Sequence, residues 1–437
     1  MSNQTPKAPS PSEPQGPPRE SRPLSGFWRA TESLRQHEFR RIFISNMFFF
    51  MAMSGQGLVR PWLAFEMTDS KLALGLVSAA VAIPMLVLAP FGGVLADRME
   101  RRGLIMSAQT LAITSELLTL ILLLTDQLEF WHLVVTAGMM GCAFPLIMPA
   151  RQAIVVNIVG KKGLGAAVGL NMSGVNVTRV LGPAVAGFLI PVIEIEGVYL
   201  MNLGLYSLAL LAMTRVRRVP PPATAADSSI AKNLADGFRY VWSNRLVLIL
   251  LIYGLVPLFL AMPFQSLLVV FAKDVWNVGS SGLGILNAAA GTGAVAGSAY
   301  IAGRSASEGR LRLMMVSAVA FGGLLAVFAA TPWFWPAVAL VFTANIFGSM
   351  FGTLNNTAIQ LLIPDAVRGR ISSFLMMSFS LPLLGTLPVT AMAERLGAPM
   401  AVGISSILAV VAAILFFLAS RSLRSLDSRV QQAMRQD

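Results

Sequence analysis

The stretch GVLADRMERR, residues 93–102, puts five charged side chains into ten positions of a chain in which only 12% of residues are charged. Apolar sequence flanks it, with VAIPMLVLAPFG before it and GLIMSAQTLAI after it. A short, strongly charged segment between two long apolar segments is typical of a loop that joins two membrane-spanning helices.

The composition supports a membrane protein. Of 437 residues, 55% are hydrophobic, and the mean hydropathy is +0.69. Apolar segments of about 20 residues, each long enough to cross a hydrocarbon core of roughly 30 Å, recur along the chain. In lipid only helices and closed barrels satisfy the backbone, so we interpret these segments as helices. The predicted fold class is an all-α integral membrane protein.

The apolar segments predict twelve transmembrane helices in two groups of six. The first group covers 42–66, 72–96, 103–125, 130–158, 163–192 and 197–214, and the second covers 246–272, 280–303, 312–330, 334–362, 367–392 and 397–420. The charged stretch at 93–102 then lies between the second and third spans.

The distribution of basic residues predicts the orientation. With the N-terminus inside, short cytoplasmic loops hold most of the Lys and Arg, whereas the opposite loops are acidic. Short loops that retain positive charge stay in the cytoplasm, so we expect both termini there, in a cell (inner) membrane. The net charge of +12 is then explained by topology and by contacts with anionic lipid headgroups, not by nucleic acid.

Five regions follow from this pattern. Residues 1–37 are predicted to be a disordered, proline-rich tail that leads into an interfacial helix, FWRATESLRQHEFRRIF at 27–43. Residues 38–214 form the first bundle, 215–245 a linker with an amphipathic helix, 246–420 the second bundle and 421–437 a cytoplasmic tail. The low hydrophobicity of the first tail favours disorder, and the spacing of apolar residues from 230 to 241 favours the linker helix.

The two halves of the chain share weak internal similarity. GVLADRMERRGLIMSA (93–108) aligns with AYIAGRSASEGRLRLMMVSA (299–318), and IVGKKGLGAAVGLNMS (158–173) aligns with IPDAVRGRISSFLMMS (363–378). Both pairs fall on loops at equivalent places in a six-plus-six plan. We therefore expect two pseudo-symmetric bundles.

These residues resemble a known family. The pattern Gly93-x-x-x-Asp97-Arg98-x-x-Arg101-Arg102 is similar to the signature loop of the major facilitator superfamily. LAFEMTDSKLALGLV (63–77), MPARQAIVVNIV (148–159), NVTRVLGPAVAGFLI (176–190) and PDAVRGR (364–370) resemble its branch of macrolide and siderophore exporters. The resemblance implies two six-helix bundles around a central cavity that opens alternately to either side of the membrane.

The charged loop is expected to be a gating element. Small residues at its start allow close helix approach, and Asp97 can lie at the N-terminus of a facing helix, which the family places in span eleven. The arginines of the motif can then close the cytoplasmic side by pairing between bundles. Arg151 is the candidate partner of Asp97. The alternatives are a loop that only sets the orientation and an Arg151 that extends along lipid to the interface.

Span five carries a second pattern of small residues. Thr178, Gly182, Pro183, Ala186 and Gly187 resemble the packing motif of antiporters in the superfamily, with Thr and Ala replacing two of the usual glycines. They predict close, kinked packing against the other bundle, although a general helix-packing face is equally compatible with them.

Ionisable residues inside spans are costly and mark functional sites. Glu116 is the carboxylate predicted at mid-membrane, and with Arg179 it is the proton-coupling candidate. Burial favours a protonated carboxyl and a neighbouring arginine favours the charged form. The alternative is a fixed structural pair of Glu116 with Arg179.

Substrate-binding candidates come from spans one, four, seven and ten. Gln56 and Arg60 could meet an anionic or carbonyl-rich group, unless Arg60 extends to the outer interface. Methionine, aromatic and amide side chains suit varied ligands. The other candidates are Met140, Phe144, Met262, Gln265, Asn345 and Asn355.

The sequence shows no pattern for nucleotide binding, for a metal or cofactor site, or for catalysis. The P-loop pattern is absent, because Lys161 in VGKKGLG is followed by Lys where Ser or Thr is required. His37, His132 and the single Cys142 suggest no metal cluster, cofactor or catalytic group. We therefore expect no enzyme.

The sequence favours a monomeric secondary transporter that exports small amphipathic, drug-like or siderophore-like compounds in exchange for protons. The alternatives are a proton-coupled or facilitative importer of a small metabolite, a non-transporting membrane scaffold and a flippase-like protein that handles lipid.

Overall fold

The computed structural model describes residues 33–160, 163–218, 238–303, 309–363, 377 and 380–420, without the side chains of residues 93, 94 and 97. Every regular element in these ranges is helical. The first half contains η1 (Ser33–Arg35), α2 (His37–Thr68), α3 (Lys71–Arg98), α4 (Arg101–Leu124), α5 (Phe130–Val159) and α6 (Leu164–Thr214). The second half contains α8 (Arg245–Leu260), α9 (Phe264–Val270), η2 (Phe271–Val275), α10 (Gly279–Ala302), α11 (Arg310–Ala330), α12 (Phe334–Leu362), α14 (Leu381–Leu396) and α15 (Ala398–Ala419).

The predicted all-helical membrane architecture is confirmed. Ten segments of the described chain are long and apolar enough to cross a membrane. One of them, α6, contains two helices that meet at Glu194, where the backbone leaves the helical region (φ 61°, ψ 178°). Helix α14 begins at Leu381, and residues 364–376, 378 and 379 before it lie outside the description. The elements therefore fit the twelve predicted crossings.

Residues 27–32 of the predicted interfacial helix at 27–43 lie outside the description, and residues 37–43 lead into the first span as part of α2. Helix α2 begins at His37 and continues without a break through the first span. Its first proline is Pro61, so no residue of the segment from 37 to 43 interrupts the helix before the membrane. Residues 1–32 and 421–437 lie outside the description, as do residues 219–237 of the linker.

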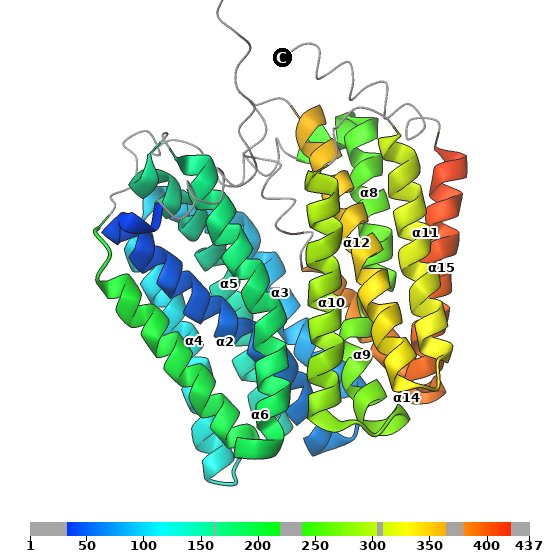
Figure 1. Ribbon diagram of the computed structural model, residues 1–437, viewed down its shortest axis with the longest axis horizontal. Helices are drawn as coiled ribbons and strands as arrows, with labels where there is room; N and C mark the ends of the chain where they lie inside the picture. Colours follow the sequence, from blue (N-terminus) through cyan, green and yellow to red (C-terminus); the bar gives the residue numbers. More distant parts are fainter. Residues whose placement is uncertain are drawn as a thin grey trace, which may run out of the picture.

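The helices form two bundles that lie side by side in Figure 1, with α2–α6 in one and α8–α15 in the other. Helix α3 contacts α14 and helix α6 contacts α10, and these pairs connect the bundles. We call the end that contains residues 69–70, 194 and 397 the outer end, following the predicted orientation. The bundles approach each other at that end and diverge toward the other, inner end (Figure 1).

The apolar core follows the same division. One continuous cluster contains outer-end residues of both bundles, among them Phe65 and Tyr199 of the first and Phe271 and Phe328 of the second. At the inner end each bundle has its own cluster, one around Ile154 and one around Tyr253, Val247 and Phe351. Because apolar burial drives association, the bundles are joined at the outer end and packed independently at the inner end.

Candidate functional site

A buried polar cluster lies inside the first bundle, around the carboxyl of Glu116 on α4. Glu116 is fully buried, and its Oε2 accepts a hydrogen bond from Gln56 Nε2 of α2. The hydroxyl of Tyr206 on α6 donates to Gln56 Oε1 at 3.4 Å. Three helices therefore contribute to the immediate surroundings of one carboxyl group.

Arg60 belongs to the same cluster. Its side chain is 5% exposed and donates to Ser115 Oγ at 3.4 Å, and it is close enough to act electrostatically on Glu116. The alternative that Arg60 extends to the outer interface is therefore wrong. The local reason is that Arg60 lies one helical turn from Gln56, so both side chains extend from α2 toward α4.

The cluster contains more hydrogen-bonding groups than it uses. Arg60 Nε, Glu116 Oε1, the Tyr199 hydroxyl and both amide atoms of Asn202 are buried without a hydrogen-bond partner. Buried polar atoms of this kind are normally satisfied by protein or by water. Chemically, the cluster can hold a carboxyl group in either protonation state.

The alternative of a fixed Glu116–Arg179 pair is wrong. Arg179 on α6 is exposed, whereas Glu116 is enclosed between α4 and α2. An ion pair among the described residues joins Arg41 and Glu38 instead, 2.7 Å apart near the inner end. The sequence alone could not show that the two residues are apart. Glu116 and Arg179 both lie midway along their spans, but on helix faces that are turned in different directions.

The remaining substrate-binding candidates differ in their accessibility. Gln56 and Met140 are buried in this conformation, and Asn345 is buried with its amide donating to the Val341 carbonyl of its own helix at 2.8 Å. Gln265 is exposed. Three candidates are half-buried, namely Phe144, Met262 and Asn355.

The charged loop is positioned by close helix packing. A Cβ atom on Gly92 would collide with the Pro145 carbonyl of α5, so the end of α3 can approach α5 only because residue 92 is glycine. Gly93 and Asp97 lie in α3, but their side-chain environment falls outside the description. The predicted contact of Asp97 therefore stays a prediction.

The arginines of the loop show contacts within the first bundle. Arg101 is buried and its Nε donates to the Ala96 carbonyl at 3.4 Å. Arg102 donates to the Thr214 carbonyl at the end of α6, at 2.8 Å, where a cation is favoured by the helix dipole. Arg98 is exposed.

Arg151 on α5 is buried rather than lipid-facing. Its side chain is 3% exposed, its Nη1 donates to Asn46 Oδ1, and its guanidinium lies 4.5 Å from the centre of the Phe49 ring. Asn46 in turn donates to Asn171 Oδ1 of α6 at 2.6 Å. The alternative of an arginine that extends along lipid is therefore wrong. Cation–π contacts of this type stabilise a desolvated guanidinium, and the sequence pattern of α2 gave no sign of them.

The small-residue pattern of α6 serves two interfaces. Gly182 packs on α2, where a Cβ atom would lie 2.8 Å from the Met51 carbonyl. A Cβ atom on Gly187 would lie 2.7 Å from Gly284 Cα on α10, in the other bundle. Thr178 and Pro183 are also buried. The predicted close packing against the other bundle is therefore found at Gly187, whereas Gly182 packs within its own bundle.

Comparison with known proteins identifies the family of this chain. The profile of a family described as transmembrane secretion effector matches residues 29–436. The chain belongs to this family of major facilitator transporters. The predicted resemblance is confirmed, and the family and its relatives are transporters rather than enzymes.

Two relatives are exporters by name. The multidrug efflux pump Tap of Mycolicibacterium fortuitum is 25% identical over 323 residues, which cover 71% of this chain and 78% of that protein. The enterobactin exporter EntS of Escherichia coli O157:H7 is 27% identical over 349 residues, which cover 76% and 80%. The nucleoside transporter NupG has a similar structure, with a TM-score of 0.69 and 16% identity over 87% of this chain and 98% of that one.

The transporter has a polar inter-bundle contact at its outer end that the sequence did not predict. At the outer end, Glu394 Oε2 of α14 accepts hydrogen bonds from the Lys71 amide at 2.6 Å, the Leu72 amide at 3.0 Å and the Ser70 hydroxyl at 3.2 Å. Ser70 is the N-cap of α3 but its own side chain does not cap the helix. An acid of one bundle therefore caps a helix of the other.

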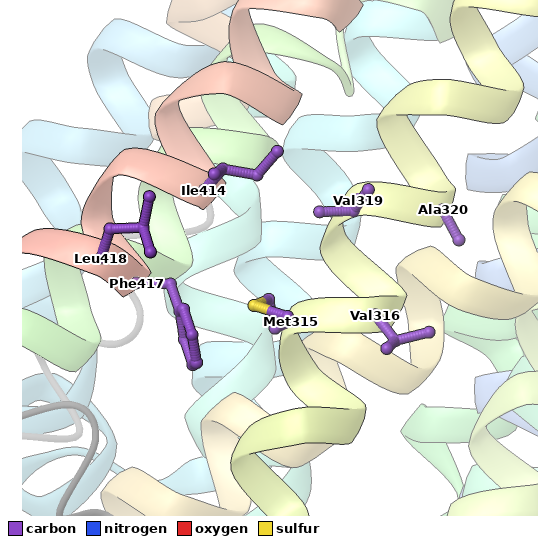
Figure 2. Close-up of a pocket in the computed structure, with 7 residues that line it drawn as sticks. All are labelled: Met315, Val316, Val319, Ala320, Ile414, Phe417 and Leu418. Atoms are coloured by element: carbon purple, nitrogen blue, oxygen red, sulfur yellow. The ribbon is translucent and has the colours of Figure 1, made fainter.

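An apolar groove between α11 and α15 lies on the flank of the second bundle, away from the first (Figures 1 and 2). Its lining consists of Met315, Val316, Val319, Ala320, Ile414, Phe417 and Leu418. This lining offers no hydrogen-bonding side chain and suits hydrocarbon. The groove is therefore not a candidate path for a polar substrate.

Proposed function

We propose that this transporter exports small amphipathic compounds from the cytoplasm in exchange for protons, by alternating access of a site between the two bundles. Two relatives with export functions support the direction of transport. The observation that carries the proposal is that the bundles are joined at the outer end and packed separately at the inner end.

The outer closure has a clear physical basis. Gly187 and Gly284 allow backbone contact between α6 and α10, and Glu394 caps α3 across the α3–α14 interface. Gly75 extends this interface, since a Cβ atom there would lie 3.0 Å from Leu387 Cα. These contacts favour an outward-closed conformation that can load cargo from the cytoplasm.

Glu116 is proposed as the proton carrier. It is the carboxyl at mid-membrane in the described spans, and the hydrogen-bonding groups around it include unpartnered atoms that can follow a change in its protonation. In this proposal Arg60 competes with the proton for the carboxylate, because an adjacent cation favours the charged form. Gln56 links the carboxyl to α2 and Tyr206, so protonation changes the contacts of three helices.

The driving force is adequate for this function. One charge that crosses the membrane gains about 2.3 kcal/mol per 100 mV. At about 1.4 kcal/mol per tenfold change in concentration, that supports a gradient of roughly fifty-fold for a neutral compound. Proton exchange therefore suffices without nucleotide hydrolysis.

The same proposal covers the cellular setting. We place the transporter as a monomer in the inner membrane of a bacterial-type cell, with both termini in the cytoplasm, in contact with anionic lipids. The bundles span 38–214 and 246–420, and the charged loop with Asp97 closes the inner side when the outer side opens. The experiments below distinguish this function from that of an importer and from that of a scaffold.

Everted membrane vesicles from an efflux-deficient bacterial host test the function. We expect addition of a fluorescent amphipathic compound to release protons from vesicles that contain the transporter, and whole cells to accumulate less of that compound. Uptake without proton release would indicate facilitation, and no compound-dependent signal across a broad panel would contradict transport.

The carrier role is tested by Glu116→Gln, which keeps the size and the hydrogen-bonding capacity of the side chain. The variant should retain binding but lose the dependence of transport on the pH gradient. Glu66→Gln, which changes an exposed acid near the outer end, is the matched control. Unchanged pH dependence in the Glu116 variant would return Glu116 to a structural role.

A further inference from the structure

One face of α6 changes from buried to exposed between the outer and inner ends. Residues 172, 176, 179, 183 and 187 follow one another at helical spacing and share that face. Gly187 and Pro183 are buried, Asn176 is half-buried, and Arg179 and Met172 are exposed. The face is therefore closed where α6 meets α10 and open over its inner half.

A second exposed face of α6 shows which way the first one is turned. Val177, Leu181, Phe188 and Val192 are between 47% and 74% exposed, from the middle of the span to its outer end. These side chains are all apolar and stay exposed beyond the level of Gly187, where the first face is closed, as expected for contact with hydrocarbon. The face that carries Arg179 lies on another side of the helix and ends at the contact with Gly284, so it is turned toward the other bundle.

The position of Arg179 relative to α10 agrees with this direction. A Cβ atom on Gly291 of α10 would lie 3.5 Å from the Arg179 carbonyl and 3.0 Å from a side-chain carbon of Val180. The backbone at Arg179 therefore lies against α10, at the interface between the bundles. Arg179 is an exposed residue midway along a membrane span, where a charge is costly unless it faces an aqueous space.

The other charged groups inside the described spans do not neutralise Arg179. Arg60 and Glu116 lie close together in their buried cluster. Arg151 is enclosed by Asn46 and the Phe49 ring. The described spans of the second bundle carry no charged side chain between their ends. The intramembrane charges of the described chain thus sum to a net positive value, with Arg179 as the exposed one.

We propose that Arg179 binds an anionic group of the cargo, so that the transporter selects organic anions over organic cations. This inference rests on the proposed export function and specifies the cargo of that same site. A positively charged surface in a low-dielectric surrounding concentrates anions, and the planar guanidinium matches a carboxylate or similar oxyanion through paired hydrogen bonds. Met172 and Asn176 supply an adaptable apolar contact and an amide on the same face.

The test compares two amphipathic fluorescent probes, carboxyfluorescein as the organic anion and ethidium as the organic cation. Export of each is measured in an efflux-deficient host that expresses the wild-type chain, Arg179→Gln, Arg179→Lys or Arg239→Gln. Arg239 is an exposed arginine near the inner end and controls for loss of a positive charge. Thermal unfolding of each purified variant verifies that it is folded.

We expect the wild type to export carboxyfluorescein, Arg179→Gln to lose at least tenfold of that rate, and Arg179→Lys to retain a part of it. Ethidium export should stay unchanged or increase in Arg179→Gln, and Arg239→Gln should resemble the wild type. Full anion export by a folded Arg179→Gln variant would overturn the inference, as would a wild type that exports only ethidium. In either case export itself, and thus the proposed function, would stand.

If the wild type exports neither probe, binding of carboxyfluorescein to the purified chain, measured by fluorescence anisotropy, decides the inference separately from the proposed function. Binding that weakens at least tenfold in Arg179→Gln would support anion recognition and place the failure in the export function. Equal binding by both proteins would overturn the inference.

Discussion

Removal of the Glu394 carboxylate should open the outer end of the transporter. Glu394 lies on α14 and accepts hydrogen bonds from two backbone amides and one hydroxyl at the start of α3. The variant Glu394→Ala removes all three acceptor contacts. Because α3 and α14 belong to different bundles, the loss acts on the outward-closed conformation and leaves each bundle intact.

The magnitude follows from ordinary helix capping. Loss of a capping side chain costs about 1 kcal/mol, and loss of a negative charge at an exposed helix N-terminus costs about 0.3–1 kcal/mol more. A destabilisation of about 1–2 kcal/mol changes a two-state ratio by roughly 5–30-fold. Glu394→Gln keeps one acceptor oxygen without the charge and should give a smaller change.

Labelling of a buried residue measures this ratio. Ser280 at the start of α10 is 4% exposed, and its carbonyl lies at the contact with Gly187. In a Cys142→Ala background, Ser280→Cys should react slowly with a membrane-impermeant maleimide added from outside. If the outward-open conformation is rare, its rate of modification is proportional to the population of that conformation.

We expect Glu394→Ala to increase the labelling rate at position 280 by roughly 5–30-fold, as the capping energies imply. Glu66→Ala removes an exposed acid near the same end and should leave the rate unchanged. A rate in Glu394→Ala equal to that of the parent would refute the role of this contact in outer closure.

Three further substitutions have defined outcomes. Gly187→Ala places a methyl group against Gly284 of the other bundle and should reduce transport severalfold, whereas Gly204→Ala, with no atom within 4 Å of the new Cβ, should not; equal efflux rates would contradict the close-contact argument. Asp97→Asn should reduce efflux while expression stays intact, and normal efflux would dismiss a gating role for the charged loop. Arg102→Gln removes the hydrogen bond to the Thr214 carbonyl and should lower the free energy of unfolding by about 0.5–1.5 kcal/mol, which thermal unfolding in detergent can detect.

The fold could be predicted from the sequence because each long apolar segment specifies a span, and each basic loop its orientation, without reference to distant residues. Each span had to satisfy its backbone within one segment, so its existence could be read without knowledge of its neighbours. Boundaries were harder to place where no residue breaks the helix, as at residues 37–43, which are continuous with the first span in α2.

The candidate site was predicted in part. Glu116, Gln56 and Arg60 were each identified as unusual polar residues inside spans, but their assembly into one cluster depends on how α2 and α4 are rotated against each other. A single sequence does not encode that rotation in any short pattern. For the same reason Glu116 was expected near Arg179, which instead faces the second bundle.

Contacts between bundles were the least accessible to sequence reasoning. Glu394 and Ser70 are separated by 324 positions, and each is an ordinary polar residue near the end of a span. Their meeting depends on the conformation of the whole molecule. Gly187 was identified from its spacing, but its partner Gly284 could be found only from the packing of α6 on α10.

The joining and separation of the bundles at their outer ends is tested most directly by a reversible cross-link. Ser78 Oγ of α3 and Ser266 Oγ of α9 lie 3.4 Å apart across the two bundles, a separation that suits a disulfide after replacement by cysteine. In a Cys142→Ala background, the double variant Ser78→Cys/Ser266→Cys should form this disulfide and stop export, and reduction should restore it. Undiminished export by the fully cross-linked protein would contradict alternating access through this interface.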